Sequence, residues 1–235
     1  MNVKIEQGKE HPLSILANQA YKVFSDLGFE IAFGPELESE WYNFDVLNVA
    51  KDHPARDMQD TFWIKGQKES VLRTHCTATT ARALEQAGKD KRLSAAFISI
   101  GKVFRNEATD ITHEMQFFQI DAAMVGENIS IADLKGVLNN FYKKMLGEDV
   151  EIEFRPSFFP FTEPSLEVFA KFKGKWLEMM GAGMLHPNVL RNIGLDPTKM
   201  QGFAFGGGLD RIAMIKWGIP DVRLFYQGDL RLNQF

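Results

Sequence analysis

The stretch RLSAAFISIGKVFRNEATDITHEMQFFQIDAAMV, residues 92–125, indicates the architecture of this chain most directly. Residues 92–105 alternate in polarity and are rich in β-branched side chains, which predicts a long strand. The polar segment 106–114 separates this strand from a second extended run over 115–125. We therefore predict a long hairpin with a charged loop at its tip.

The rest of the chain adds helices and further hairpins to this element. Apolar residues at helical spacing from Leu13 to Leu27 predict a helix that Gly28 ends, and Ser130 with Asp133 predicts a capped helix. A helix is also expected over 77–86, and strands are expected over 29–33, 150–155, 166–171, 176–180 and 201–205. Hairpins rather than crossover helices mostly join these strands, so we predict an α+β fold with an antiparallel sheet flanked by helices.

Composition narrows the class of protein. The chain has 235 residues with 45% hydrophobic and 25% charged residues, as in an ordinary globular domain. Its one cysteine, Cys76, excludes a disulfide framework and a thiolate zinc cluster. No run reaches the roughly 18 apolar residues of a membrane span, and residues 1–10 form a leader without an apolar region. We expect one cytoplasmic domain over 1–235 with no membrane partner.

A net charge of −4 argues against a broad basic face for nucleic acid, although it leaves room for a local contact. The histidines lie far apart in the sequence and give little signal for a metal site. His75 and Cys76 are adjacent, but neighbours on a strand face opposite sides, so we do not expect a catalytic dyad from them.

A triple glycine at 206–208 precedes Arg211 at a predicted junction between strand and helix. It matches neither the dinucleotide fingerprint nor the P-loop. The glycines could let backbone approach a ligand while Arg211 meets a phosphate, or they could form a tight turn beside a surface arginine. The residues alone leave both interpretations open.

The predicted hairpin carries polar side chains near its tip. Arg105, Glu107 and His113 flank the charged loop, and Phe117, Gln119 and Asp121 share one face of the returning strand. An aromatic ring, an amide and a carboxylate on one face could hold a purine and an ammonium group. A half-polar antiparallel strand is the alternative interpretation.

The run SFFPFTEPS, residues 157–165, contains two prolines that a central strand would not tolerate. We therefore place the rings of Phe159 and Phe161 at a bend or an edge. There they could wall an apolar pocket or fill the core.

Taken together, several strings resemble the catalytic core of the phenylalanyl-tRNA synthetase α-subunit family, a class II aminoacyl-tRNA synthetase family. The resemblance runs roughly from residue 11 to residue 235. The strings are YNFDVLN (42–48), DHPARDMQDTFW (52–63), LRTH (72–75), GKVFRNEATDITHE (101–114), FFPFTEPS (158–165), WLEMMGAGMLHPNVL (176–190) and GFAFGGGLDRIAM (202–214).

The resemblance implies the class II sheet and a role for each matching residue. Residues 28–38 look like the dimer-interface motif, and residues 104–121 and 206–211 look like the two ATP-site motifs. The implied ATP-binding residues are Arg105, Glu107, His113, Phe117 and Arg211, with both arginines catalytic; the implied amino-acid-binding residues are His75, Thr77, Gln119, Asp121, Phe159, Phe161, Ala204 and Gly206.

The resemblance also implies substrates and partners. These are ATP with Mg²⁺, L-phenylalanine, tRNA(Phe), and a β subunit or a second copy bound through the dimer-interface motif. Metal ligands are not assigned. The resemblance begins near residue 11, so we expect no counterpart of the family's N-terminal coiled-coil arm. An arm-less paralogue that adenylates an amino acid for another acceptor, and a regulatory paralogue without catalysis, are therefore alternatives.

The chain departs from the family pattern at four positions near the implied site. The family usually has Glu at Asp121, His at Phe118, Ser at Thr77 and Glu at Asp210. Three of the four changes retain a charge or a hydroxyl.

Overall fold

The computed structural model describes residues 8–56, 60–67, 69–172 and 174–234. A seven-stranded sheet with the order β1-β4-β5-β9-β8-β7-β6 forms its centre. Its strands are β1 (Glu30–Ile31), β4 (Ala95–Phe104), β5 (Gln116–Gly126), β6 (Glu151–Phe159), β7 (Thr162–Phe172), β8 (Lys175–Leu185) and β9 (Gln201–Gly208). Neighbouring strands in this described sheet are antiparallel except β1 and β4, which are parallel. The predicted α+β class is confirmed.

The hairpin predicted over 92–125 is present as β4 and β5. Its register pairs Ala95 with Val125 at one end and Phe104 with Gln116 at the other. The charged segment forms the connecting loop, which the backbone N–H of Arg105 closes on the carbonyl of Met115 at 2.9 Å.

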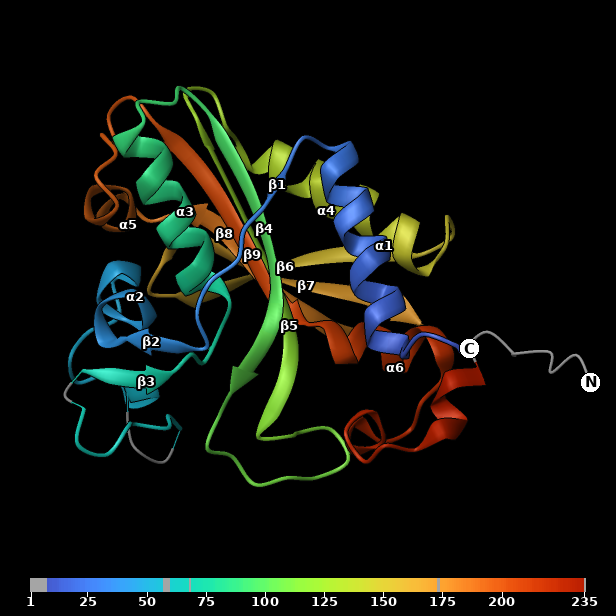
Figure 1. Cartoon of the computed structure of the whole chain (residues 1–235). Helices are drawn as coiled ribbons and strands as arrows, with labels where there is room; N and C mark the ends of the chain where they lie inside the picture. Colours follow the sequence, from blue (N-terminus) through green and yellow to red (C-terminus); the bar gives the residue numbers. More distant parts are fainter. Residues whose placement is uncertain (1–7, 57–59, 68, 173, 235) are drawn as a thin grey trace, which may run out of the picture.

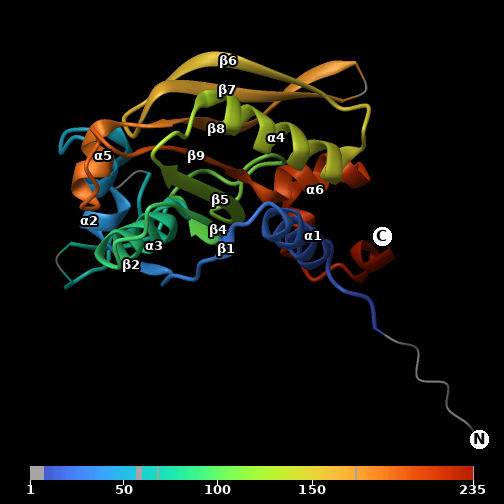
Figure 2. The ribbon, with the colours of Figure 1, turned by 90° about the horizontal axis from the view of Figure 1, so that it is seen from above.

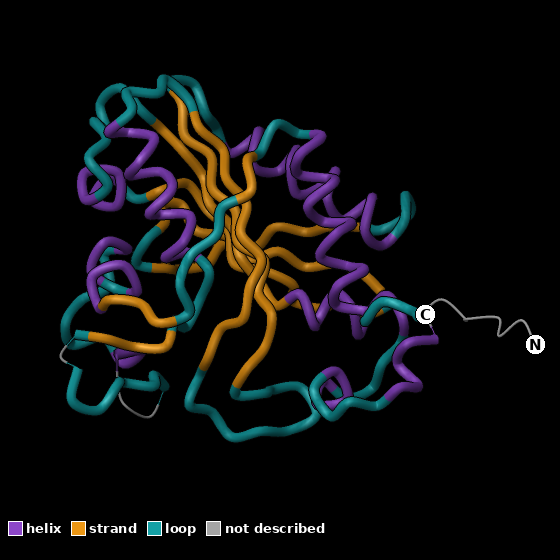
Figure 3. Tube along the Cα trace, in the orientation of Figure 1, coloured by secondary structure: helices purple, strands orange, loops and turns teal. Residues whose placement is uncertain are grey.

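Helices cover both faces of the sheet, as Figures 1 and 3 show. On one side lie α1 (Pro12–Asp26), α4 (Ile131–Leu146) and α6 (Leu209–Trp217). On the other side lie α2 (Glu40–Asn43), α3 (Thr77–Lys89) and α5 (Pro187–Asn192). The view from above separates the same two groups (Figure 2).

Local sequence explains where the longer helices begin and end. The Ser130 hydroxyl and the Asp133 carboxylate form the predicted capping box of α4, each bonding the other's backbone N–H. Helix α1 follows the N-cap His11, and Gly28 takes φ +85° just beyond its end. Helix α3 continues three residues beyond the expected end at Gln86.

Two apolar clusters fill the space between the helices and the sheet. In the first, α1, α4 and α6 pack on the sheet around Phe24, whose ring lies 5.0 Å from that of Phe141 and 5.6 Å from that of Phe205. In the second, α3 and α5 pack around Phe44, Leu84 and Phe97. Runs of consecutive buried residues in β4, β5 and β9 show that the central strands are covered on both faces, whereas the edge strand β6 has no buried residue.

A second, two-stranded sheet and helix α2 form a smaller unit beside α3. Strands β2 (Leu37–Ser39) and β3 (Ser70–Leu72) pair antiparallel. Short 3₁₀ turns lie at Asp45–Leu47 and Pro54–Arg56, and others near the C-terminus lie at Val222–Phe225 and Leu230–Gln234.

Three local expectations need correction. The extended run at 29–33 is a two-residue strand that pairs parallel with β4, because a connection through α3 separates the two. The strand expected over 201–205 continues through the triple glycine to Gly208, directly before α6, so the predicted junction between strand and helix is confirmed but contains no separate turn. Pro164 lies in the interior strand β7, where a register shift between Thr162 and Ser165 interrupts the ladder.

The remaining expectations concern the proline turn, the leader and the membrane. Pro160 forms the predicted bend between β6 and β7, and β6 is an edge strand. Most of the predicted leader, 1–10, lies outside the described residues. Within the part of the chain that the structure describes, no helix is long and apolar enough to cross a membrane.

Candidate active site

A cavity of about 840 Å³ opens between the β4–β5 hairpin, the start of α3, strands β8 and β9, and α6. Every residue that the sequence predicts for the site lines it. They are His75, Thr77, Arg105, Glu107, His113, Phe117, Gln119, Asp121, Phe159, Phe161, Ala204, Gly206 and Arg211. Segments more than a hundred residues apart thus meet at one place, although their roles remain predictions.

The pairing of β5 with β9 explains the glycines. Asp121 lies opposite Gly206, and a Cβ added at Gly206 would lie 2.8 Å from the Asp121 carboxylate. A Cβ at Gly207 would lie 2.5 Å from the carbonyl oxygen of Met179 on β8. These two glycines make room for neighbouring side chains and backbone, which neither of our two sequence interpretations anticipated.

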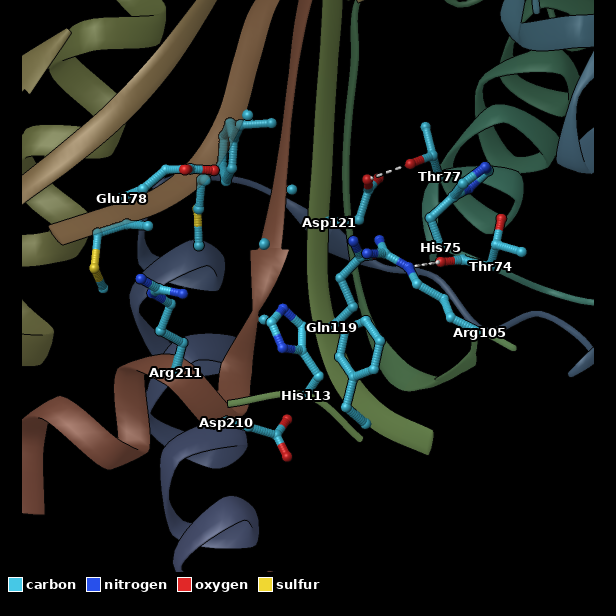
Figure 4. Close-up of a pocket in the computed structure, with 18 of the residues that line it drawn as sticks. Thr74, His75, Thr77, Arg105, His113, Gln119, Asp121, Glu178, Asp210 and Arg211 are labelled. Carbon is cyan, nitrogen blue, oxygen red and sulfur yellow. Dashed lines mark hydrogen bonds between the residues drawn. The ribbon is translucent and has the colours of Figure 1, made fainter. Parts of the chain in front are cut away.

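Asp121 is a buried carboxylate at the inner end of the cavity, with 2% of its surface exposed. The hydroxyls of Thr77 and Thr80 each donate to it at 2.6 Å (Figure 4 shows the Thr77 bond). Burial raises its pKa to about 7, and the two hydroxyl bonds act in the opposite direction. A cationic group entering the cavity would favour the ionised form.

Gln119 lies beside Asp121 and is held by the backbone at the start of α3. Its side-chain oxygen accepts a hydrogen bond of 2.7 Å from the backbone N–H of Cys76. The Cys76 thiol points away toward the carbonyl oxygens of Gly101 and Gln119, and burial raises its pKa to about 12. This agrees with our expectation that His75 and Cys76 form no dyad.

His75 has a defined protonation state. Its Nε2 lies 3.0 Å from the carbonyl oxygen of Asn43, which can only accept, so Nε2 carries the proton. Nδ1 is buried and has no hydrogen-bond partner among the described residues. Burial, and then the charge of Arg105, lowers the His75 pKa to about 4. The ring is therefore neutral near pH 7.

Arg105 leaves β4 at the start of the hairpin loop. Its Nε donates to the carbonyl oxygen of Thr74 at 3.4 Å, and its nearest carboxylate partner among the described residues is Glu107 at 3.9 Å. The guanidinium carbon lies 5.1 Å from the centre of the Phe117 ring. Such weak pairing leaves the charge of Arg105 available to an anion.

Arg211 faces the cavity from the first turn of α6. In Figure 4 it lies with Glu178 on one side of the cavity, and Arg105, His75 and Asp121 lie on the other. Among the described residues Arg211 has no ion pair. The cavity therefore has a weakly paired cation on each side.

His113 and Asp210 lie near the outer end of the cavity. The exposed His113 ring contacts Asp110 at 3.1 Å, and bonds from Thr112 and His113 hold the pKa of Asp110 well below its usual range. The buried Asp210 accepts bonds from the Tyr226 hydroxyl and, at 2.8 Å, from the backbone N–H of Phe118. Burial raises the Asp210 pKa to about 6.

Two aromatic rings form an apolar wall of the cavity. The rings of Phe159 and Phe161 are stacked, with centres 5.7 Å apart and planes 8° from parallel. Gly181 leaves room for Phe159, because a Cβ there would lie 2.9 Å from the ring. Ala204, which is buried, also lines the cavity, and its role as the floor beneath these rings stays a prediction.

Sequence reasoning missed several supporting residues. Thr80 lies one turn after Thr77 on α3, a spacing that could have indicated a second donor to Asp121. Asn43 bonds both the hydroxyl and the backbone N–H of Thr74 at 3.1 Å and also binds His75. Nothing in the local sequence signals that Tyr226 meets Asp210.

Comparison with known proteins agrees with this geometry. The family model described as "tRNA synthetases class II core domain (F)" matches residues 1–235. The chain is 49% identical to the "Phenylalanine--tRNA ligase alpha subunit" of Bacillus mycoides (strain KBAB4), over 98% of this chain and 70% of that protein. The same figures hold for the protein of that name from Bacillus cytotoxicus. The chain therefore belongs to the class II tRNA synthetase family, among its phenylalanine–tRNA ligase α subunits.

Proposed function

We propose that this chain activates L-phenylalanine with ATP, releases pyrophosphate, and transfers the phenylalanyl group to tRNA(Phe). The observation that carries the proposal is a single cavity that combines a buried carboxylate, an aromatic wall and two weakly paired arginines. These features complement an ammonium group, a phenyl ring and a polyphosphate in turn.

We assign the inner end of the cavity to phenylalanine. Asp121 and Gln119 would hold the α-ammonium group, which supplies the cation that the buried carboxylate lacks. The ring would lie against Phe159 and Phe161 above Ala204. The neutral ring of His75, held by the carbonyl oxygen of Asn43, would line this end of the cavity beside them.

We assign the outer end to ATP. Adenine would stack on Phe117, with Glu107 accepting from its amino group, and Arg211 would meet the terminal phosphate. His113 would approach the phosphates at the rim. Arg105 lies between the two ends, where it can contact both the α-phosphate and the substrate carboxylate.

The reaction needs positioning and charge stabilisation more than a covalent catalyst. The carboxylate of phenylalanine attacks the α-phosphorus of ATP, the new bond forms the mixed anhydride, and pyrophosphate leaves with the electron pair of the broken bond. Negative charge grows on the phosphoryl oxygens during this step. Fixed guanidinium groups such as Arg105 and Arg211 stabilise it without reorganisation.

Mg²⁺ fits the cavity as an ion that arrives with the nucleotide. Among the described residues, no group of three or more His, Cys, Asp or Glu side chains could hold a metal ion by itself. Mg²⁺ is usually held by one or two carboxylates together with substrate phosphates, and Glu178 lines the cavity on the side of Arg211. When bound, the ion would neutralise phosphate charge.

A partner chain belongs to the proposal. The segment that resembles the dimer-interface motif exposes Ile31 at 42% and Phe33 at 83%. Exposed apolar residues on one edge of a sheet suit a protein interface. We propose that a β subunit, or otherwise a second copy of the chain, covers them, and that the assembly works in the cytoplasm where tRNA(Phe) is charged.

Pyrophosphate exchange tests the proposal. With ATP and Mg²⁺, labelled pyrophosphate should enter ATP only when phenylalanine is present, and charged tRNA(Phe) should form when a β chain is added. Omission of phenylalanine, or replacement by leucine, is the control. Pyrophosphate exchange without any charging of tRNA would favour adenylation for another acceptor. Absence of exchange both in the chain alone and in the chain with a β subunit would refute the proposal.

A further inference from the structure

We propose that Asn48 is a positioning residue that sets the aromatic wall of the phenylalanine pocket. The inference rests on the proposed function, because it assigns Phe159 and Phe161 to the substrate ring. Asn48 touches neither ring. It acts through the peptide that joins them.

The contact is a single long-range hydrogen bond. Asn48 Nδ2 donates to the carbonyl oxygen of Pro160 at 2.7 Å, across 112 residues of sequence. Pro160 lies between Phe159 and Phe161 in the turn that connects β6 with β7. The position of this carbonyl therefore helps to fix the directions in which both rings leave the backbone.

A second amide fixes the orientation of the first. Asn188 Nδ2 donates to Asn48 Oδ1 at 3.0 Å, and Asn188 Oδ1 accepts from Arg191 at 2.6 Å. Asn48 Oδ1 is thus occupied as an acceptor, which leaves its Nδ2 facing Pro160. The chain of donors from Arg191 to Pro160 runs in one direction only.

The backbone at position 48 favours asparagine. Asn48 ends the 3₁₀ turn Asp45–Leu47 with φ +60° and ψ +22°, in the left-handed region. Asparagine tolerates this region better than most residues other than glycine. The residue type thus meets two demands at once, the turn and the amide that reaches Pro160.

The wall has other supports that come from its own neighbourhood. Phe159 N–H donates to the Ser165 hydroxyl at 3.0 Å, and His186 N–H donates to the Phe161 carbonyl oxygen at 3.0 Å. These bonds fix the two ends of the turn. Asn48 fixes its middle from the end of the 3₁₀ turn Asp45–Leu47, so the turn between β6 and β7 cannot tilt without breaking that bond.

A small tilt would matter because the Phe159 ring packs closely on β8. The Phe159 ring lies so close to Gly181 that an added Cβ would come within 2.9 Å of it. A wall that moves by a few tenths of an ångström therefore either strikes β8 or opens a gap around the substrate ring. Either change weakens phenylalanine binding and leaves the ATP end unaffected.

The test compares three variants of the full chain in its active assembly. Asn48→Asp keeps the left-handed turn and the acceptor for Asn188 but loses the donor to Pro160. Asn188→Ala leaves residue 48 unchanged but frees its amide. Asn192→Ala is the matched control. Asn192 Nδ2 bonds the carbonyl oxygens of Asp45 and Val46 at 3.2 and 3.3 Å, and it makes no bond to residues 159–161, the turn between β6 and β7.

The readouts are the KM values for phenylalanine and ATP in pyrophosphate exchange, and crystal structures of the variants. We expect KM for phenylalanine to rise about three- to tenfold in Asn188→Ala and more in Asn48→Asp, the range for loss of one hydrogen bond. KM for ATP should stay unchanged, and the turn 159–161 should be displaced. Asn192→Ala should lower thermal stability without changing KM for phenylalanine.

Three results would overturn the inference. The first is a KM for phenylalanine in active Asn48→Asp that equals that of the wild type. The second is a rise in this KM in Asn192→Ala as large as that in Asn48→Asp. The third is a turn 159–161 that is not displaced in the structures of Asn48→Asp and Asn188→Ala. If Asn48→Asp does not fold, Asn188→Ala decides. Failure of the proposed function would appear instead as a wild type without phenylalanine-dependent exchange, and the variant structures would then decide the inference alone.

Discussion

Replacement of Asp121 by asparagine should stabilise the empty protein at high pH and abolish its use of phenylalanine. The carboxylate is 2% exposed, and its pKa is about 7 in the folded chain against 3.8 for an unperturbed Asp. Each pKa unit corresponds to about 1.36 kcal/mol, so ionisation costs roughly 4 kcal/mol more in the folded than in the unfolded chain.

The sign of the pH dependence follows from where the proton is held. Between about pH 4 and pH 7 the folded chain keeps a proton on Asp121 that the unfolded chain has lost. The free energy of unfolding therefore falls as pH rises through this window, by up to about 1.4 kcal/mol per pH unit. The proton on Asp121 contributes its full stabilisation below pH 3.8, the pKa of an unperturbed Asp. This stabilisation is lost above about pH 7, the pKa of Asp121 in the folded chain.

Asparagine fits the same place without this titration. The Thr80 hydroxyl, released from Asp121, can donate to the Thr77 carbonyl oxygen 3.1 Å away, and it can then accept from the new amide. The variant should keep its fold. Its stability relative to wild type should rise by up to about 4 kcal/mol between pH 4 and pH 8.

Urea unfolding of both proteins between pH 4 and pH 8.5 measures this difference. The other titrating groups, among them Asp210 and His75, are shared and cancel. Asp26→Asn, at an exposed carboxylate paired with Lys22, is the control and should give a nearly parallel curve. A difference between wild type and Asp121→Asn that stays constant over the whole range would refute the assignment of a strained buried carboxylate.

Activity gives the second half of the same prediction. Saturating phenylalanine should flatten the pH dependence of the wild type, because an ammonium beside Asp121 lowers its pKa. It should leave Asp121→Asn unaffected, and phenylalanine-dependent exchange by the variant should fall at least about 100-fold, as for loss of a charge-assisted contact. Undiminished exchange would remove Asp121 from the amino-group site.

Three further predictions concern the remainder of the site. Arg105→Ala and Arg211→Ala should each reduce exchange by at least about 30-fold, since each removes about 2–4 kcal/mol of phosphate stabilisation; normal exchange by either purified, folded variant would contradict its role. Ala204→Gly should improve the use of para-chloro-phenylalanine relative to phenylalanine, measured as the ratio of kcat/KM, and an unchanged ratio would show that this methyl does not limit the pocket. Tyr226→Phe removes one hydrogen-bond donor from the buried Asp210, so the free energy of unfolding should fall by about 1–3 kcal/mol near pH 8. Near pH 5, where Asp210 is protonated, the fall should be smaller. An equal loss at both pH values would contradict this account.

The sequence predicted those parts of the structure that local patterns determine. Alternating residues over 92–125 identified the hairpin, and spacing by two placed Phe117, Gln119 and Asp121 on one face. The strings around Phe159 and Arg211 identified the remaining walls through resemblance, because spacing alone cannot bring segments so distant together.

The parts that sequence reasoning missed depend on contacts between distant segments. A proline within an interior strand is tolerated at Pro164 only because the ladder shifts there, which the sequence of β7 does not reveal. The bond from Asn48 to Pro160 and that from Tyr226 to Asp210 join residues with no pattern in common. Their physical origin is the packed fold, so they become visible only in three dimensions.

The charges of the cavity explain why the protein should be more stable with substrates than without them. The carboxylate of Asp121, whose pKa burial raises to about 7, is unfavourable in the empty site. The guanidinium groups of Arg105 and Arg211, which have weak or no ion pairs among the described residues, are unfavourable there as well. Phenylalanine supplies the missing cation and ATP the missing anion, so each ligand removes a different source of strain. Arg105 lies between the phenylalanine end and the ATP end of the cavity. Binding of one ligand should therefore reduce the electrostatic cost of binding the other. The groups that destabilise the empty protein are therefore the ones that stabilise the transition state. This is expected of a site whose charges complement the reacting groups rather than the protein without ligands.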